Sequence, residues 1–428
     1  MQSASPVRSE ERITSLDTIR GFALLGILLM NIVGFGLANA YDDPTNAGGA
    51  TGIDLWTWVV MHVLAEGKMR CLFSMVFGAG IVLLTSRAEQ RADGSNAADI
   101  HYRRNLWLGG FGILHAYLLW QGEILYPYAY CALVLYPFRR AAPRTLITLA
   151  AVLMAITAAC AVLNARETNT ILVEGKAAAA LKQTDAKLTE AQAEALGKWE
   201  ELRKHAKPTP AEIEKTNAKW RGSLWDVLKV RATSVWRWHS IAYYHFWNLD
   251  IFSMMLLGMG LFRLGVFSAA RSKAFYARLA IGGYVVGITV NSITAWTRVT
   301  SGFDIVASGY TMLTYDLGRL SIALAHASVL LLLVKCEVMV WLTRRLGAVG
   351  QMALSNYLTH SVVCSTLFCG YGFGLYGRLA RHELYYVVGG LWLFQLWISP
   401  IWLRHFQFGP AEWAWRSLTY WQRQPMRR

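Results

Sequence analysis

The sequence predicts an all-α protein, a polytopic bundle of transmembrane helices with about ten spans. Hydrophobic residues make up 54% of the 428 residues, which suits a helical membrane protein better than a soluble domain. Long apolar stretches recur along the chain, and a spanning helix needs roughly 20 mostly apolar residues. The 18 Trp, 19 Tyr and 17 Phe also fit the aromatic belts that membrane proteins place at both interfaces.

Ten stretches meet this requirement or approach it closely. The second is too long for one simple span, while the third and fourth are joined only by Gln121-Gly122, which predicts a tight helical hairpin. We expect residues 1–165 to hold the first five spans and residues 240–428 to hold the last five, with a basic tail. The ten stretches are 16–38, 56–86, 105–120, 123–138, 144–164, 243–266, 277–297, 316–341, 349–370 and 384–404.

Lys and Arg residues predict the orientation of the bundle. Arginines precede the first stretch, whereas the next connector, 39–53, holds Asp42 and Asp43 and no Lys or Arg. Basic connectors alternate along the chain with connectors that hold few or no basic residues. The cytoplasmic loops of membrane proteins carry an excess of Lys and Arg. We therefore expect both termini in the cytoplasm. The net charge of +15 then reflects topology signals and contact with anionic membrane lipids, and we expect no nucleic-acid partner.

Residues 166–239 interrupt the pattern and predict a small extracytoplasmic insert. They are charged and mixed, with an Ala-rich stretch over 176–207 and a helix breaker at Pro208-Thr209-Pro210. Long loops cross a membrane regardless of their charge, so the lysines of this segment agree with the orientation. We expect the insert to be helical.

Familiar motifs for a nucleotide, metal or hydrolase site are absent from the sequence. The six cysteines form no CxxC pair and fall in apolar runs, which predicts small buried hydrophobes rather than disulfides or metal ligands. The chain also lacks a P-loop, a zinc motif and a G-x-S-x-G elbow. We therefore expect no metal, and the candidate site residues are polar residues within or beside the apolar stretches.

The first apolar stretch carries Asp17, Arg20 and Asn31. A charge near the middle of a membrane helix costs roughly 2.5–3.5 kcal/mol, so such residues usually face a partner, water or a substrate. Asp17 and Arg20 are spaced to pair on one helix face, or Arg20 instead faces a cytoplasmic vestibule and binds an anionic ligand. Asn31 lies on nearly the same face, where it either bonds to a neighbouring helix or lines a site.

A second group of charges breaks the 56–86 stretch at residues 66–70, whose sequence is EGKMR. Charged residues and a glycine inside an apolar run predict a bend or re-entrant turn, which is tolerated where protein or water shields the backbone. Lys68 and Arg70 either contact a substrate or snorkel to the outer interface. His62 adds a titratable group with the same two interpretations.

His115 lies inside the apolar stretch 105–120, and Glu123 follows across the predicted turn. The two side chains are expected to approach each other, and a His with a carboxylate partner is a usual general base. The alternative is a histidine that only packs in the bundle. His326 and His360 also lie within predicted helices, which makes that alternative a serious one.

Five stretches together resemble the bacterial YeiB-type family of integral membrane proteins: 12–32, 67–80, 103–125, 350–361 and 399–428. The resemblance covers nearly the whole chain except the insert. Through Leu16-Asp17, Arg20-Gly21 and Asn31, the family is similar to transmembrane acyltransferases of the heparan-alpha-glucosaminide N-acetyltransferase type. This resemblance implies an acyl group taken from cytoplasmic acyl-CoA, acetyl-CoA being expected, and given to an unknown acceptor on the far side. It also implies a multi-pass protein of the bacterial inner membrane.

The resemblance leaves two candidates for a catalytic histidine. The acetyltransferase type carries a His shortly after its first helix, in a motif that this chain lacks. His62 is the nearest by position, and His115 is the nearest by context in the YeiB-type pattern. That pattern usually has Asp where this chain has Glu123, so the carboxylate is kept.

An acyltransferase hypothesis assigns the donor to the cytoplasmic mouth of the bundle. Arg20, Arg103 and Arg104 would bind the phosphates of acyl-CoA, because the planar guanidinium donates two parallel hydrogen bonds to phosphate. The pantetheine arm would then thread toward the bundle interior. Further residues expected to contact substrate are Asp17, Lys68, Arg70 and Trp120.

The same hypothesis assigns the chemistry to polar residues deeper in the bundle. His115, oriented by Glu123, would deprotonate an acceptor hydroxyl or amine. Asn31 or Lys68 would stabilise the developing oxyanion.

The competing hypothesis is a proton-coupled transporter of a small polar or anionic solute. Intramembrane His, Asp and Glu residues also form proton relays, and the break at 66–70 is typical of a discontinuous transporter helix. We see no repeat relating the two halves of the chain, which favours the enzyme. The sequence is also compatible with a homo-oligomer.

Overall fold

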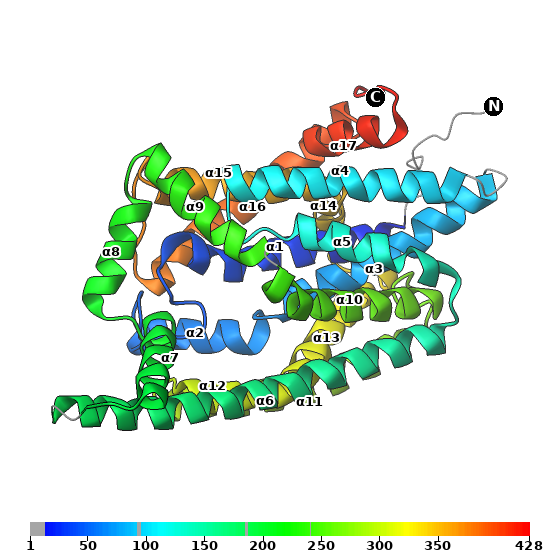
Figure 1. Cartoon of the computed structure of the whole chain (residues 1–428). Helices are drawn as coiled ribbons and strands as arrows, with labels where there is room; N and C mark the ends of the chain where they lie inside the picture. Colours follow the sequence, from blue (N-terminus) through cyan, green and yellow to red (C-terminus); the bar gives the residue numbers. More distant parts are fainter. Residues whose placement is uncertain (1–12, 92–95, 185–186, 240) are drawn as a thin grey trace.

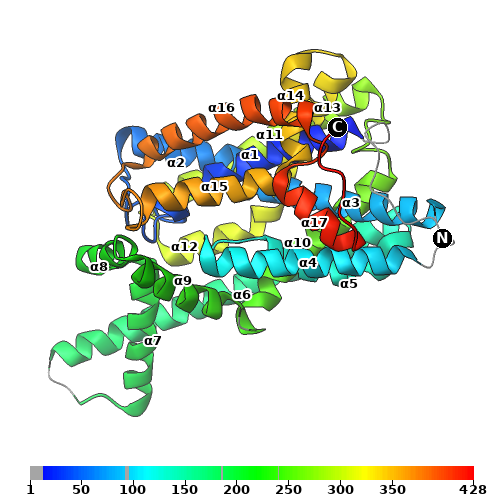
Figure 2. The same cartoon turned by 90° about the horizontal axis from the view of Figure 1, so that it is seen from above.

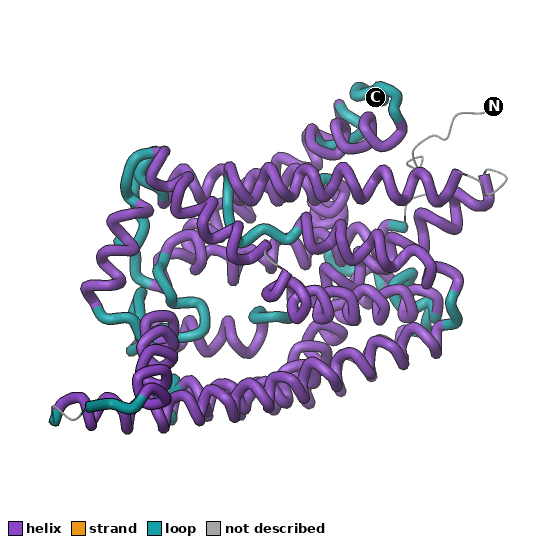
Figure 3. Tube along the Cα trace, in the orientation of Figure 1, coloured by secondary structure: helices purple, strands orange, loops and turns teal. Residues whose placement is uncertain are grey.

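The computed structural model describes residues 13–91, 96–184, 187–239 and 241–428 (Figure 1). In this part of the chain, Figure 3 shows helices and loops, and one isolated bridge joins Phe406 to Arg427. The elements are α1 (Thr14–Gly36), α2 (Gly52–Leu64), α3 (Lys68–Arg91), α4 (Asn96–Leu118), α5 (Leu125–Leu135), η2 (Tyr136–Arg140), α6 (Pro143–Gln183), α7 (Glu190–Ala206), α8 (Pro210–Trp220), α9 (Leu224–His239), α10 (Ile241–Arg263), α11 (Lys273–Thr300), α12 (Ile305–Tyr310), η3 (Thr311–Thr314), α13 (Tyr315–Lys335), α14 (Val340–Gln351), α15 (Ala353–Phe368), α16 (Arg381–His405) and α17 (Pro410–Tyr420).

Six helical stretches among the described residues are long and apolar enough to cross a membrane. They are Thr14–Gly36, Gly52–Gln90, Pro143–Gln183, Lys273–Thr300, Ile305–Lys335 and Arg381–His405. Figures 1 and 2 show that α1 and α4 lie across the molecule in about the same direction, so the bundle has two ends. The predicted all-α class is therefore confirmed, and the protein is a helical membrane protein.

We call the end of the bundle where α1 begins and α3 finishes the basic end. Arg20, Arg87 and Arg104 line one cavity there. Arg139 lies nearby, where its Nε donates to Glu89 Oε1 near the end of α3 at 2.9 Å. The opposite end is called the far end.

The predicted bend within residues 56–86 is present between α2 and α3. Gly67 has a φ of +71°, a left-handed conformation that favours glycine. A Cβ atom at this position would also stand 2.2 Å from the Tyr315 hydroxyl. The bend therefore needs glycine for both conformation and space, and it sets the polar residues around it inside the protein.

Two pairs of helices pack with their backbones in close contact. In the first pair, a Cβ at Gly21 of α1 would lie 1.9 Å from the Leu346 carbonyl oxygen of α14. In the second, a Cβ at Gly78 of α3 would lie 2.1 Å from the Met255 carbonyl oxygen of α10. Small residues allow such approach in membrane helices, where van der Waals packing holds the helices together.

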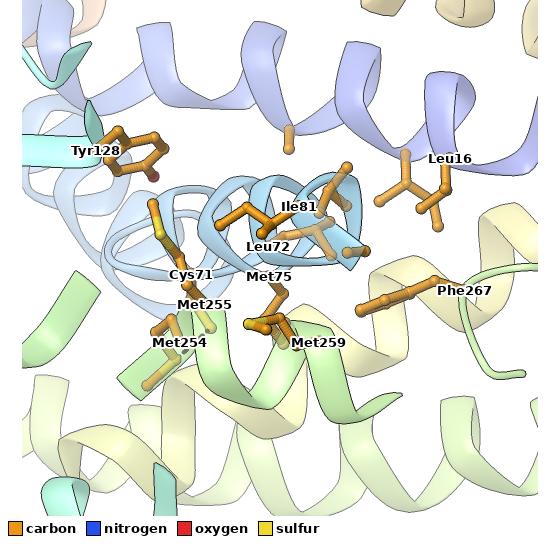
Figure 4. Packing of buried hydrophobic residues seen from close by; sticks show 14 of the residues in the cluster. Leu16, Cys71, Leu72, Met75, Ile81, Tyr128, Met254, Met255, Met259 and Phe267 are labelled. Atoms are coloured by element: carbon orange, nitrogen blue, oxygen red, sulfur yellow. Dashed lines mark hydrogen bonds between the residues drawn. The ribbon is translucent and has the colours of Figure 1, made fainter. Parts of the chain in front are cut away.

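The main hydrophobic core lies between α1, α3 and α10, and Figure 4 shows part of it. Met254 and Met255 of α10 face Cys71 and Met75 of α3, and Cys71 Sγ lies 3.3 Å from Met254 Sδ. The flexible thioethers fill the irregular space between the helices. Four cysteines are buried as predicted, whereas Cys160 is half-buried and Cys336 is exposed, so their prediction as buried residues is wrong.

The segment 166–239 is helical and packs onto the far end of the bundle. Residue 166 falls inside α6, which continues unbroken from the predicted span into the segment. Trp220 and Val227 are buried in the same cluster as Phe368 of α15. The Gly370 amide donates to the Trp220 carbonyl at 2.9 Å, which ties α8 to the loop after α15.

Candidate functional site

A cavity of about 230 Å³ lies between α1, α3, α4, α5, α15 and α17. Charged side chains line it at the basic end, where Arg20, Arg87 and Arg104 face the same space. Deeper walls are apolar and include Ile27 and Phe77. Because an α-helix rises 1.5 Å per residue, Ile27 lies about 10 Å beyond Arg20 along α1. The cavity therefore suits an elongated ligand with an anionic head and a less polar arm.

Arg20 both pairs with Asp17 and lines the cavity. Its Nη1 donates to Asp17 Oδ1 at 2.5 Å, and it also reaches the Gly350 carbonyl oxygen at 3.5 Å. Both Asp17 and Arg20 line the cavity. The ion pair therefore does not remove Arg20 from the path of a ligand.

Arg104 and Arg103 have different surroundings despite being neighbours. The Arg104 guanidinium lies 3.8 Å over the Trp415 ring, and Trp415 Nε1 donates to the Arg104 carbonyl at 2.7 Å. Arg103 instead pairs with Asp99 on the same helix at 2.6 Å and does not line the cavity. The structure thus keeps Arg104 as a candidate for phosphate binding and moves Arg103 away from this cavity.

The C-terminal helix α17 forms one wall of the cavity, through Glu412, Trp415 and Arg416. Glu412 accepts hydrogen bonds from the Leu354 amide at 2.6 Å and the Ser355 hydroxyl at 2.5 Å, at the start of α15. Burial raises the pKa of the Glu412 carboxyl, although these hydrogen bonds oppose that shift. The sequence predicted only a basic tail in this region. The contacts of α17 with α4 and α15 join residues that are far apart in the chain, so no local pattern indicates them.

His115 is buried, and its Nε2 lies 2.7 Å from Ser361 Oγ of α15. Its ring also packs against Tyr357, with ring centroids 5.1 Å apart. Tyr357 is in turn a wall residue at the inner part of the cavity. The residue beside His115 is therefore Ser361, which sequence reasoning did not single out because a lone serine is common in membrane helices.

Glu123 lies beside another histidine. Its Oε1 is 3.8 Å from His239 Nε2 of α9, and its Oε2 accepts a hydrogen bond from the Tyr126 amide at 3.0 Å. The expected pairing of Glu123 with His115 is therefore wrong. The reason is that α9, which the sequence placed in an external insert, enters the bundle and supplies His239.

A buried arginine from α9 reaches the end of α4, close to His115. Arg231 Nη1 donates to the Leu118 carbonyl oxygen at 2.5 Å. The side chain is almost fully buried. Arg231 therefore brings a positive charge from the 166–239 segment to within one helical turn of His115 along α4.

Lys68 lies in the protein interior beside the bend. It is completely buried, and its Nζ donates to the His62 carbonyl at 2.6 Å and to Asn291 Oδ1 at 2.8 Å. The snorkelling interpretation of Lys68 is therefore wrong. His62 Nε2 contacts Thr294 Oγ1 at 3.0 Å, and Glu66 accepts from the Tyr315 hydroxyl at 2.9 Å.

Arg70 joins a partly buried group of ion pairs between α3, α10 and α13. Its guanidinium lies 3.4 Å from Asp250, which also pairs with Arg319. The Arg319 Nε donates to Asp316 at 2.7 Å. This cluster couples three helices through four charged side chains.

A small pocket of about 10 Å³ lies near the bend, with room for about one water molecule. Met30 of α1 lines this pocket, whereas Ile27 lines the large cavity. Along α1, the nearest lining residues of the two spaces are therefore three residues apart, a helix rise of about 4.5 Å. The other residues that line the small pocket are Tyr41, Asp42, Trp58, Met61, His62, Glu66, Arg298, Arg381 and Tyr385.

Asn31 and Trp120 lie apart from the cavity. Asn31 is partly exposed on α1 and does not line the cavity. Trp120 stacks on Phe35 with ring centroids 4.2 Å apart, in the core at the far end. The structure therefore gives Trp120 a packing role and does not bring Asn31 to His115.

Comparisons with known proteins find relatives along nearly the whole chain. An uncharacterized protein of Escherichia coli strain K12, YeiB, is 30% identical over 96% of this chain and 96% of its own length. An uncharacterized protein of Bacillus subtilis strain 168, YxaH, is 28% identical over 100% of this chain and 98% of its own length. Residues 261–422 match a family described as "Protein of unknown function (DUF418)", a segment that includes Ser361 and Glu412.

Proposed function

This chain belongs to the YeiB-type family of bacterial membrane proteins, and we propose that it is a membrane acyltransferase. It takes an acyl group, with acetyl expected, from cytoplasmic acyl-CoA and gives it to a hydroxyl or amine acceptor on the other side. In this proposal it is a multi-pass protein of the inner membrane, with the basic end in the cytoplasm. The observation that carries the proposal is the cavity, which is basic at one end and apolar at the other.

The chemistry of coenzyme A matches the two parts of this cavity. Its phosphates carry negative charge, and Arg20, Arg87 and Arg104 face the space at the basic end. Arginine suits phosphate because its fork donates two parallel hydrogen bonds. The pantetheine arm is elongated and less polar, so the inner walls formed by Ile27 and Phe77 can accommodate it. The thioester then lies at the inner end.

His115 is the proposed base at that inner end. It lies directly behind Tyr357, which lines the cavity, so a shift of this one ring opens the way to a bound thioester. A neutral histidine takes a proton from an attacking hydroxyl or amine. General base catalysis of this kind typically raises the reaction rate by about 10²–10⁴-fold. The proposal needs no carboxylate beside His115, in contrast to the hypothesis drawn from the sequence.

A proton-coupled transporter is the second candidate, and one specific observation favours it. Ile27, which lines the large cavity, and Met30, which lines the small pocket, lie less than one turn apart on α1. The small pocket is lined by titratable residues, among them Asp42, His62 and Glu66. Titratable residues inside a membrane protein commonly form proton relays, which a proton-coupled transporter needs.

Binding of acetyl-CoA to the detergent-purified protein separates the two functions. We expect acetyl-CoA to raise the melting temperature of the wild-type protein, and Arg20→Ala and Arg104→Ala to abolish that shift. Arg344→Ala is the matched control, because Arg344 is exposed on α14 and does not line the cavity. No shift in a folded wild-type protein at millimolar acetyl-CoA would favour the transporter.

A further inference from the structure

Ser361 and His115 pair a hydroxyl nucleophile with an imidazole base in the bundle core. The Ser361 Oγ lies 2.7 Å from His115 Nε2, and both side chains are buried. A serine within about 2.6–3.2 Å of a histidine nitrogen has the geometry of an activated nucleophile. Ser361 is on α15 and His115 is on α4, so the contact depends on the packing of two separate helices.

The pair lies directly behind the inner wall of the cavity. Tyr357 lines the cavity, and Ser361 follows it by four residues on the same face of α15. The Tyr357 ring also contacts the His115 ring. A thioester at the inner end of the cavity is therefore separated from Ser361 by one side chain.

The second ring nitrogen of His115 is not held by a third side chain of the described residues. When Ser361 donates its hydroxyl proton to Nε2, Nδ1 carries the ring proton. Nδ1 is buried and has no hydrogen-bond partner among the described residues. An unpaired buried donor costs about 1–3 kcal/mol. His101 Nδ1 is unpaired in the same way, but its Nε2 meets the Ala132 carbonyl at 2.9 Å rather than a hydroxyl. The hydroxyl partner therefore distinguishes His115.

We propose that Ser361 is the nucleophile that carries the acyl group as a covalent ester, with His115 as its base. This inference rests on the proposed acyl transfer. His115 Nε2 takes the Ser361 proton while Oγ attacks the thioester carbonyl carbon. The carbon–sulfur bond then breaks, the coenzyme A thiolate leaves with the proton from His115, and Ser361 holds the acyl ester.

The second half of the reaction returns the enzyme to its starting state. The acceptor hydroxyl or amine attacks the ester carbonyl while His115 takes its proton. The bond to Ser361 Oγ breaks, and His115 returns the proton to that oxygen. Coenzyme A therefore leaves before the acceptor reacts, so the first half-reaction needs no acceptor. This makes the assignment testable while the acceptor is unknown.

To test the assignment, the full-length protein is incubated with acetyl-CoA and no acceptor, and two products are measured: free coenzyme A thiol and acetylated protein. Released thiol is followed against time, and mass spectrometry locates an acetyl group on the peptide that contains Ser361. We expect a burst of about one thiol per protein chain and an acetyl group on Ser361. Ser361→Ala abolishes both, and His115→Gln slows the burst by about 100-fold or more. Ser361→Cys restores the adduct as a thioester.

Ser365→Ala is the matched control, because Ser365 is one turn further along α15 and donates only to the Leu119 carbonyl at 2.7 Å. It is expected to keep the burst. A burst and an adduct that persist in Ser361→Ala overturn the assignment. So does a wild-type protein that shifts its melting temperature with acetyl-CoA but forms no adduct, and in that case the proposed acyl transfer still stands. A wild-type protein that does not bind acetyl-CoA overturns both.

Discussion

The Glu412 carboxylate of α17 caps α15 by accepting hydrogen bonds from the hydroxyl and the backbone amide of Ser355, at 2.5 Å and 3.1 Å. The first amides of a helix have no partner within that helix, so a carboxylate placed there completes their hydrogen bonding. This contact ties the C-terminal helix to the helix that carries Ser361. It also fixes one wall of the cavity, because Glu412 lines it.

Replacing Glu412 by alanine is expected to loosen α17 and lower the free energy of unfolding by about 2 kcal/mol. The reason is that the substitution leaves buried donors of Leu354 and Ser355 unpaired, which costs about 1–3 kcal/mol. Chemical denaturation in detergent measures this difference. Glu201→Ala, at an exposed position of α7, is the control and should have little effect. Equal stability of the two variants would contradict the capping role.

The stability contributed by Glu412 is expected to decrease as the pH rises. Burial raises the pKa of its carboxyl in the folded protein, so the folded state binds a proton more tightly than the unfolded state. The contribution is therefore complete below the unfolded pKa of about 4.3 and declines as the pH rises through the folded value. Denaturation at pH 5 and pH 8 should show a larger loss for Glu412→Ala at the lower pH. A larger loss at pH 8 would mean that the carboxyl is stabilised in its charged form.

Sequence patterns were sufficient where one helix contains the whole signal. Asp17 and Arg20 are three residues apart, so their pairing follows from helix geometry. The bend beside Lys68 also follows from a local signal, a glycine among charges in an apolar run. In each of these cases, the partners or the conformation lie within a few residues of chain.

The remaining parts of the candidate site depend on contacts between distant segments. His115 and Ser361 are 246 residues apart in sequence. Glu123 was expected beside His115 because the two are close in sequence, but α9 enters the bundle and brings His239 to Glu123. Helix packing decides these pairings, and one sequence does not specify which faces meet.

Filling the cavity is expected to prevent ligand binding without unfolding the protein. Gly80 lines the cavity, and a Cβ atom added there meets nothing within 4 Å. Gly80→Leu therefore places a side chain in the cavity, and we expect it to abolish the melting-temperature shift with acetyl-CoA. Gly282→Leu is the control, since Gly282 also has open space around it but lies exposed on α11. An unchanged shift in Gly80→Leu would place the ligand elsewhere.

Valine is expected to reduce the stability of the protein at one glycine of α3 and to have little effect at another. A side chain at Gly78 meets the Met255 carbonyl oxygen of α10, and backbone atoms cannot yield as a side chain does. We expect Gly78→Val to lower the free energy of unfolding by about 3 kcal/mol or more, the upper part of the range for overpacking. Gly80→Val, two residues further along α3, should leave the stability nearly unchanged. Denaturation of both variants measures the difference, and equal losses would show that α3 and α10 are not in close backbone contact.

Neutralising Asp250 is expected to destabilise the bundle more than neutralising Asp316. Asp250 is shared by Arg70 and Arg319, so Asp250→Asn removes one charged partner from each arginine. Removing one member of a fully buried ion pair costs about 3–5 kcal/mol, and we expect a smaller loss here because Arg70 and Asp250 are only partly buried. Asp316→Asn should cost less, since Asp250 still pairs with Arg319.

Unfolding in detergent with a denaturant gives the two free-energy differences, and a compensating change tests their origin. In Asp250→Asn, the added substitution Arg70→Met removes one of the two positive charges that Asp250 paired with, so we expect it to recover part of the lost stability. If the loss came from altered packing of α10 instead, Arg70→Met would only add to it. A further loss of stability on adding Arg70→Met would contradict the role of Asp250 as the shared partner that joins α3, α10 and α13. A larger loss of unfolding free energy in Asp316→Asn than in Asp250→Asn would contradict it as well.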